Sequence, residues 1–259
     1  MPETDLTARP LFGTGALFVP QSSLFGTSDL FGRSTDPLVS GYEGEVLADS
    51  PLLLWKLDES AGTTAVDSSG NGNDGTYSGT YTLAAASGYP DARSVPYFDG
   101  GRVLGNAKIT SDATFTIECW FEKDDFKSGQ TANINSLIGD LRSTSNGVMV
   151  RWDGDVSTLR AYVAGQGTYL TVDASPTLED HRYHYVLTSN GTHLGVYLNG
   201  VQVALVAGAA TGFDMTWAAA GIWSGGGQAM YMLGSVGWVA VYPTALSADR
   251  VAAHYAAGL

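Results

Sequence analysis

Short apolar runs separated by turn-forming residues make up most of this chain. From about residue 48 onward the runs are rich in β-branched and aromatic side chains, and Gly, Asn, Asp, Ser and Pro gather between them. Many short strands with little helix predict an all-β sandwich, and 259 residues fit a single large one. The expected strands are PLLLWKL, TFTIECWFE, SLIGDL, GVMVRW, TLRAYV, YHYVLTS, LGVYLNG, VQVALV and GSVGWVAVY.

Two local patterns refine this prediction. Asn199-Gly200 separates two alternating runs and is a preferred dipeptide of type I′ hairpins. The segment LSADRVAAHYAA is expected to be helical, with Ser247 as its N-cap and Asp249 in its positive first turn. The side chains expected to face the sandwich are Leu246, Val251 and Tyr255.

Charge, cysteine content and hydropathy exclude several classes of function. A net charge of −13 argues against a nucleic-acid partner, because the phosphate backbone would be repelled. The single cysteine, Cys119, lies in an alternating run and is expected to be a buried apolar side chain without a disulfide. The N-terminus lacks a signal-peptide pattern and no apolar run reaches membrane-spanning length, so synthesis in the cytosol and no membrane partner are expected.

Residues 1–47 differ in composition from the rest of the chain. Pro, Ser, Thr and Gly dominate, and a Leu-Phe pair recurs in LFGTG, ALFVP, LFGTS and LFGRS without helix or strand spacing. The segment is either a disordered leader or an extended arm whose Leu-Phe pairs dock on a partner protein. We favour the docking arm, because idle linkers seldom expose several phenylalanines. The docking residues are Leu11, Phe12, Leu17, Phe18, Leu24, Phe25, Leu30 and Phe31.

Several longer segments resemble the successive blocks of one family. They are SPLLLWKLDESAGTTAVDSSGNGNDGTYSG, PYFDGGRV, TFTIECWFE, HRYHYVLTSNGTHLGVYLNGVQVA and GSVGWVAVYPTALSADRVAAHYAAG. In this order they resemble a laminin-G-like, concanavalin A-like jelly roll over about residues 48–258. The resemblance implies a jelly-roll β-sandwich at residues 48–259, preceded by the arm and closed by a short C-terminal helix. It is specific for the fold, which hosts lectins, adhesins, hydrolases and spacers.

The same resemblance implies a structural calcium ion near VDSSGNGNDG. The oxygen ligands carried over from the family are Asp67, Asn71, Asn73 and Asp99. One departure opposes calcium, since Gly237 stands where the family often has a carboxylate. The alternative is a plain Asx/Gly turn, in which Asp67 and Asn71 bond only to their own backbone. No other cofactor is expected.

The sequence argues against catalysis. Hydrolases of this fold resemble Glu-x-Asp-x-x-Glu on one strand, and that run does not occur here. The four histidines lack the spacing of zinc ligands, and His184 is expected to be a structural residue bonded within the sandwich. We therefore expect a protein that is not an enzyme.

Glycan binding fits the pattern better. β-Sandwich sugar sites use aromatic faces for stacking, with nearby Asp, Asn and Gly groups for the hydroxyls. Aromatic residues at predicted strand ends with polar neighbours are the candidates, against an alternative in which the tryptophans belong to the core. The candidate residues are Trp152, Asp153, Asp155, Trp217 and Trp223.

A jelly roll without a signal peptide and with a docking arm suggests a virion protein. Domains that resemble this one are common in minor tail proteins and capsid decorations of bacteriophages. We expect a phage structural protein, located in the virion as a homo-oligomer, whose arm contacts other virion proteins and whose sandwich binds host-surface glycans. The alternatives are a purely structural decoration or cement protein, and a non-phage surface adhesin.

Overall fold

The computed structural model describes residues 41–125, 135–139, 146–152, 158–165, 168–174, 181–223 and 229–259. The chain divides into two compact units, Met1–Asp36 and Pro37–Leu259, and every described residue belongs to the second unit. The predicted docking residues of the Leu-Phe repeats lie outside the described residues.

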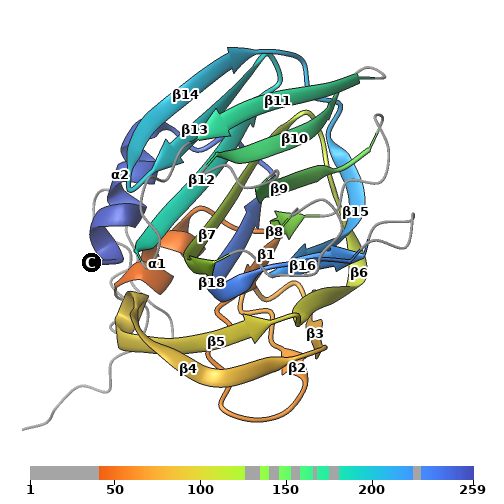
Figure 1. Cartoon of the computed structure of the whole chain (residues 1–259). Helices are drawn as coiled ribbons and strands as arrows, with labels where there is room; N and C mark the ends of the chain where they lie inside the picture. Colours follow the sequence, from red (N-terminus) through yellow and green to blue (C-terminus); the bar gives the residue numbers. More distant parts are fainter. Residues whose placement is uncertain are drawn as a thin grey trace, which may run out of the picture. The chain divides into compact units, whose positions relative to one another are not determined.

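Two antiparallel sheets pack face to face as a β-sandwich, as the resemblance implied (Figure 1). Sheet 1 contains β1 (Leu53–Trp55), β4 (Tyr81–Tyr89), β5 (Arg93–Asp99), β7 (Thr114–Asp125), β12 (Arg182–Asn190), β13 (His193–Leu198), β14 (Val201–Ala207) and β18 (Leu233–Tyr242). Its order is β14-β13-β12-β7-β18-β5-β4, and β1 also pairs with β18.

Sheet 2 supplies the opposite layer. It contains β2 (Thr64–Ala65), β3 (Gly75–Ser78), β6 (Arg102–Ser111), β8 (Asn135–Gly139), β9 (Val148–Trp152), β10 (Leu159–Gly165), β11 (Thr168–Ala174) and β15 (Phe213–Ala219). Its order is β11-β10-β9-β8-β15-β6-β3-β2. A separate hairpin joins β16 (Gly221–Trp223) to β17 (Ala229–Tyr231).

Alternation along the strands builds the core between the sheets. In β7 the side chains of Phe115, Ile117, Cys119 and Phe121 enter the main hydrophobic cluster, while Glu118 points to the other face. The prediction that Cys119 is a buried apolar side chain is confirmed, and burial raises the pKa of its thiol.

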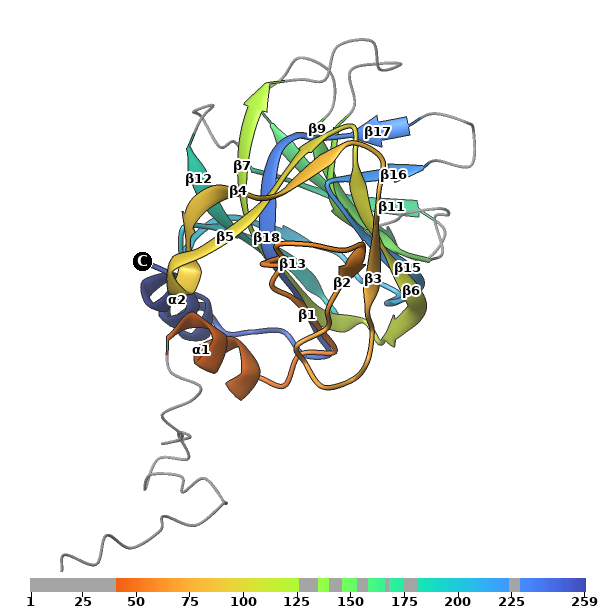
Figure 2. The same cartoon turned by 90° about the horizontal axis from the view of Figure 1, so that it is seen from below.

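Two short helices cover the outer face of sheet 1. Helices α1 (Tyr42–Ala48) and α2 (Ala248–Ala257) contact each other and lie together at one side of the sandwich (Figure 2), and a 3₁₀ turn, η1 (Pro90–Ala92), contacts α1. Their buried side chains join a second hydrophobic cluster on this face, with Tyr42, Val46 and Val251 fully buried. Helix α1, which contains the predicted boundary at residue 47, is thus packed on the sandwich.

The two local predictions near the C-terminus are confirmed. Asn199 and Gly200 have φ values of 51° and 77°, the left-handed pair that a type I′ hairpin requires between β13 and β14. Ser247 precedes α2 and its side chain accepts a hydrogen bond from the Arg250 amide. No helix in the described part of the chain is long and apolar enough to cross a membrane.

Candidate functional site

The structure corrects two of the predicted sugar-stacking residues. Trp152 and Trp217 are only 2% and 0% exposed, and both belong to the core between the sheets. Trp152 ends β9 opposite the buried Leu159, and the Trp217 ring makes an edge contact with Phe213 at 5.1 Å. Both residues sit at inward positions of alternating strands, so neither indole can stack on a ligand in this structure.

The other predicted sugar-binding residues lack a described side chain. Trp223 ends β16, where its backbone pairs with Ala229 of β17. Asp153 and Asp155 lie outside the described residues.

Polar side chains instead gather on the outer face of sheet 2. Inward positions of β9 and β10 fill the core, so the alternate residues of these strands point away from it. The pairing registers align these alternate residues in two rows across β8, β9, β10 and β11. We call them the outer-face rows. The first row is Ser136, Arg151, Arg160 and Asp173, and the second is Gly139, Met149, Tyr162 and Thr171.

Contacts within the rows fix the orientation of four planar groups. Arg160 donates to both carboxylate oxygens of Asp173, from Nε at 2.6 Å and from a terminal nitrogen at 2.9 Å. The Arg151 guanidinium lies over the Tyr162 ring, 4.4 Å from its centroid. Hydrogen bonds to Asp173 and then Tyr162 raise the pKa of Arg160, which keeps this guanidinium charged.

The outer-face rows are partly covered by other side chains and partly exposed to solvent. The side chains of Arg160 and Asp173 are 35% and 45% exposed. Met149 packs with Met230 of β17 in a small apolar cluster, and the Met230 sulfur lies 3.9 Å from an Arg151 nitrogen. The hydroxyl of Ser136 is buried and has no hydrogen-bond partner among the described residues. The face thus combines accessible charged groups with an apolar border, an arrangement suited to binding a polar ligand.

The VDSSGNGNDG loop folds into a network of side-chain to backbone hydrogen bonds. One Asp67 oxygen accepts from the amides of Leu54 and Ser69, each at 2.9 Å. The other accepts from the Ser69 hydroxyl and the Asn73 amide, each at 2.8 Å. The side-chain amide of Asn71 donates to the carbonyls of Pro51 and Leu52.

This network contains the predicted Asx turn, in which the Ser69 amide donates to Asp67. It also goes beyond that turn, because Asp67 and Asn71 bind backbone groups of residues 51–54 and do not bond only to their own backbone. Asn73 also donates its side-chain amide to a backbone carbonyl, that of Leu52, at 2.8 Å. Asp99, the fourth predicted ligand, ends β5. Within the described ranges, no group of three or more His, Cys, Asp or Glu side chains is arranged to hold a metal ion. Calcium at this loop stays a prediction.

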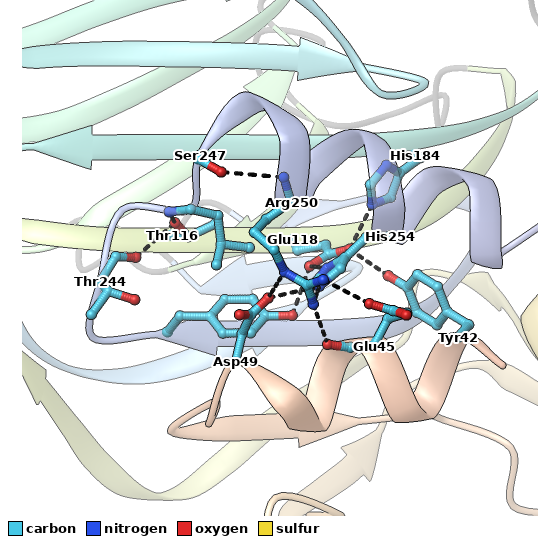
Figure 3. Close-up of polar contacts among 12 residues, drawn as sticks. Tyr42, Glu45, Asp49, Thr116, Glu118, His184, Thr244, Ser247, Arg250 and His254 are labelled. Atoms are coloured by element: carbon cyan, nitrogen blue, oxygen red, sulfur yellow. Dashed lines mark hydrogen bonds and ion pairs between the residues drawn. The ribbon is translucent and has the colours of Figure 1, made fainter. Parts of the chain in front are cut away.

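A second polar cluster lies beneath the two helices (Figure 3). Glu118 of β7 is fully buried and accepts hydrogen bonds from Tyr42 at 2.6 Å and Tyr242 at 2.7 Å. Its carboxylate also meets His184 Nε2 at 2.6 Å and His254 Nδ1 at 2.9 Å. These four partners come from α1, β18, β12 and α2, so one carboxylate ties both helices to sheet 1.

Charge and burial determine the ionisation of this carboxylate. Burial raises the pKa of Glu118, but His254 and His184 lower it more, so the pKa lies well below its usual range. Because Glu118, His184 and His254 are all 0% exposed, a substrate cannot reach them and the cluster is structural. The prediction that His184 is bonded within the sandwich is confirmed.

Comparison with known families agrees with this architecture. The family model described as the concanavalin A-like lectin/glucanases superfamily matches residues 98–252. The chain belongs to this superfamily. The match spans β6 to β18 and the first half of α2, and it includes the outer-face rows. No curated protein matches the chain.

Solved structures resemble the sandwich at low sequence identity. Domain 4 of AbnA, a GH43 extracellular arabinanase from Geobacillus stearothermophilus in complex with arabinotriose, is 15% identical with a TM-score of 0.57, over 80% of this chain and 98% of that one. The binding domain of botulinum neurotoxin serotype D is 13% identical with a TM-score of 0.61, over 80% of this chain and 51% of that one.

A third similar structure is that of botulinum neurotoxin type C, whose cell entry depends upon interaction with two ganglioside molecules. It is 13% identical with a TM-score of 0.58, over 82% of this chain and 51% of that one. This chain therefore spans about half the length of the toxin chains that it matches. At these identities the likeness shows the concanavalin A-like fold.

Proposed function

We propose that this protein binds glycans through the outer-face rows of sheet 2. The observation that carries the proposal is the set of Arg160, Asp173 and Tyr162, held by rigid strands and partly open to solvent. Paired guanidinium and carboxylate groups match the adjacent hydroxyls of a sugar, and an aromatic ring next to them favours its apolar face. The arabinotriose complex of the arabinanase domain and the ganglioside interaction of the type C toxin support a glycan as the ligand class.

Binding without catalysis is part of this proposal. Asp173 directs both oxygens at Arg160, so it is poorly placed to donate a proton to a glycosidic oxygen. Glu118 is fully buried under the helices. The superfamily includes glucanases as well as lectins, so an assay for new reducing ends on the same polysaccharide tests this part. The release of new reducing ends would contradict binding without catalysis.

The proposal places the protein in a bacteriophage virion, as a minor tail or capsid decoration protein. Support comes from the sequence, in which the repeated Leu-Phe pairs of residues 1–40 suit docking on other virion proteins. A homo-oligomer on the particle belongs to the same proposal. Antibodies against the sandwich should label purified particles in electron micrographs, and labelling equal to preimmune serum would contradict the virion location.

Glycan binding is tested with the labelled full chain on intact bacteria and purified cell-wall polysaccharide. We expect saturable binding that soluble saccharide competes away. Arg160→Ala and Tyr162→Ala should each weaken it by about tenfold or more, the loss expected for a charge-assisted or stacking contact. The matched control is Arg93→Ala, which removes a partly exposed ion-paired arginine from sheet 1.

Two results would contradict the glycan proposal. Binding no greater than that of heat-denatured protein would favour a purely structural decoration, an alternative that the burial of Trp152 and Trp217 also favours. Equal weakening by the outer-face and control variants would place the ligand elsewhere on the molecule.

A further inference from the structure

His254 lies between two carboxylates from different parts of the fold. Its Nδ1 is 2.9 Å from Glu118 of β7, and its Nε2 is 2.9 Å from Asp49, the C-cap residue of α1. The ring is fully buried. A histidine in α2 therefore bridges the sheet and the first helix (Figure 3).

This geometry determines how many protons the ring holds. A carboxylate is an acceptor, so each ring nitrogen that faces one must be an N–H donor. A neutral imidazole has one N–H, and only the imidazolium has two. His184 differs, since Nε2 faces Glu118 while Nδ1 has no hydrogen-bond partner among the described residues, and one proton is enough.

We propose that the His254 imidazolium is a protonation-dependent latch that holds helix α1 to the sandwich. A helix of seven residues is not stable without tertiary contacts. Several side-chain contacts of α1 and its C-cap converge on the latch, because Tyr42 donates to Glu118 and Arg250 binds both Glu45 and Asp49.

The groups that face His254 come from every element packed around it. Asp49 and Glu118 are the two anions in direct contact, and Arg250 is the nearest cation at 3.2 Å. The neighbouring titratable groups behind them are Tyr42, Glu45, His184 and Tyr242. Loss of the Nδ1 proton would leave a lone pair facing the Glu118 carboxylate, which is repulsive. Loss of the Nε2 proton would leave a lone pair that faces both the Asp49 carboxylate and the donating Arg250 nitrogen.

The direction of the pH dependence follows from this environment. Burial lowers the pKa of His254, but Glu118 and Asp49 raise it more, so the folded pKa lies above the ordinary value of 6.5. The stabilisation is thus complete below pH 6.5 and is lost as the pH rises through the folded pKa. The pKa of Glu118 is lowered, so its contribution to the stability of the fold is lost only as the pH falls below 4.5, the ordinary pKa of a glutamate. The latch should therefore hold best between these two values.

The test measures ring protonation and helix protection in the full chain. Long-range proton–nitrogen NMR at about pH 6 should show two protonated nitrogens in His254. Hydrogen-exchange protection factors of the α1 amides should fall as this ring loses a proton, by about tenfold for each unit by which the folded pKa exceeds 6.5. A single protonated nitrogen at pH 6, or constant α1 protection through the deprotonation, would overturn the proposal.

Variants separate the latch from a general effect of pH. His254→Gln should remove the pH dependence of α1 protection, whereas His193→Gln, at an exposed histidine of β13, should preserve it. If His254→Gln does not fold, Asp49→Asn removes one of the two flanking anions and should move the midpoint of α1 release to lower pH by about one unit or more. An unchanged midpoint in Asp49→Asn would overturn the latch.

Discussion

Glu118 shows how a buried charge can organise one face of a sheet. The carboxylate has no exposed surface, yet hydroxyl and imidazole groups from four elements surround it. Desolvation of such a charge is offset only while its partners remain in place. The energetic cost of changing this residue should therefore be much larger than that of changing an exposed ion pair.

Glu118→Gln should lower the free energy of unfolding by about 3–5 kcal/mol, because the amide leaves the buried His254 imidazolium without one of its two anions. Urea denaturation followed by tryptophan fluorescence measures the loss. The matched control is Glu122→Gln on the same strand, where the partner is Arg182 and the side chain is 31% exposed. That change should cost less than about 1 kcal/mol, and equal losses for the two variants would contradict the role given to Glu118.

The outer-face residues were missed from the sequence because the face of a strand changes with every position. The pattern GVMVRW indicates a strand, but its register was assigned by treating Trp152 as an exposed strand end. In the structure Trp152 faces inward and its neighbour Arg151 faces outward. Strict alternation through Val148 and Val150 was the available signal, and it places Trp152 with the core.

Trp152→Ala tests this assignment. Removal of a buried indole should lower the free energy of unfolding by about 3–5 kcal/mol. Tyr162→Ala, on the opposite face of sheet 2, should cost clearly less while it weakens glycan binding. The same denaturation curves and binding isotherms measure both variants, and an undiminished stability of Trp152→Ala would show that the indole is not part of the core.

Helix α2 was predictable because its signals are local. A serine cap, an acidic first turn and a periodic apolar face all fall within LSADRVAAHYAA. Ser247→Ala should lower the free energy of unfolding by about 0.5–2 kcal/mol, since the Arg250 amide loses its acceptor. Ser247→Gly should lower the free energy of unfolding by only about a few tenths of a kcal/mol. A larger loss for glycine than for alanine would argue against capping by Ser247.

For the VDSSGNGNDG loop, the sequence predicted polar turns but not the partners of the side-chain oxygens. The composition indicated oxygen-rich turns, but whether those oxygens meet a cation or backbone amides depends on their directions, which the sequence does not specify. The packing around Gly237 bears on the family comparison, because a Cβ at this position would clash with the Val95 side chain. A carboxylate there would require Val95 to move.

Asp67→Asn should lower the free energy of unfolding by about 1–3 kcal/mol, because one of its two accepting oxygens becomes a donor. Asp112→Asn, at an exposed position, is the control and should have little effect. Thermal melts with calcium and with chelator test the calcium prediction in the same experiment. If the loop binds calcium, the ion raises the Tm of the native chain but not that of Asp67→Asn. Equal Tm values of the native chain with calcium and with chelator would contradict calcium binding.

At the scale of the whole molecule, the sandwich was predictable from the family resemblance, whereas helix α1 was not. YEGEVLA is too short to show a helical period, and it follows a segment dominated by Pro, Ser, Thr and Gly that resembles a linker. Its helix depends on partners distant in the chain, since Asp91 accepts from the amides of Tyr42 and Glu43. Because of these tertiary contacts, the compact unit that contains the sandwich begins on the N-terminal side of Tyr42.

Two truncated chains test this boundary. A fragment of residues 37–259 retains α1 and should unfold at the same urea concentration as the full chain. A fragment of residues 49–259 loses Tyr42 and Val46, both fully buried, and exposes part of the cluster around Trp238 and Glu118. It should be less stable by about 3 kcal/mol or more. Coincident unfolding curves for the two fragments would show that α1 is dispensable and that the sandwich begins at β1.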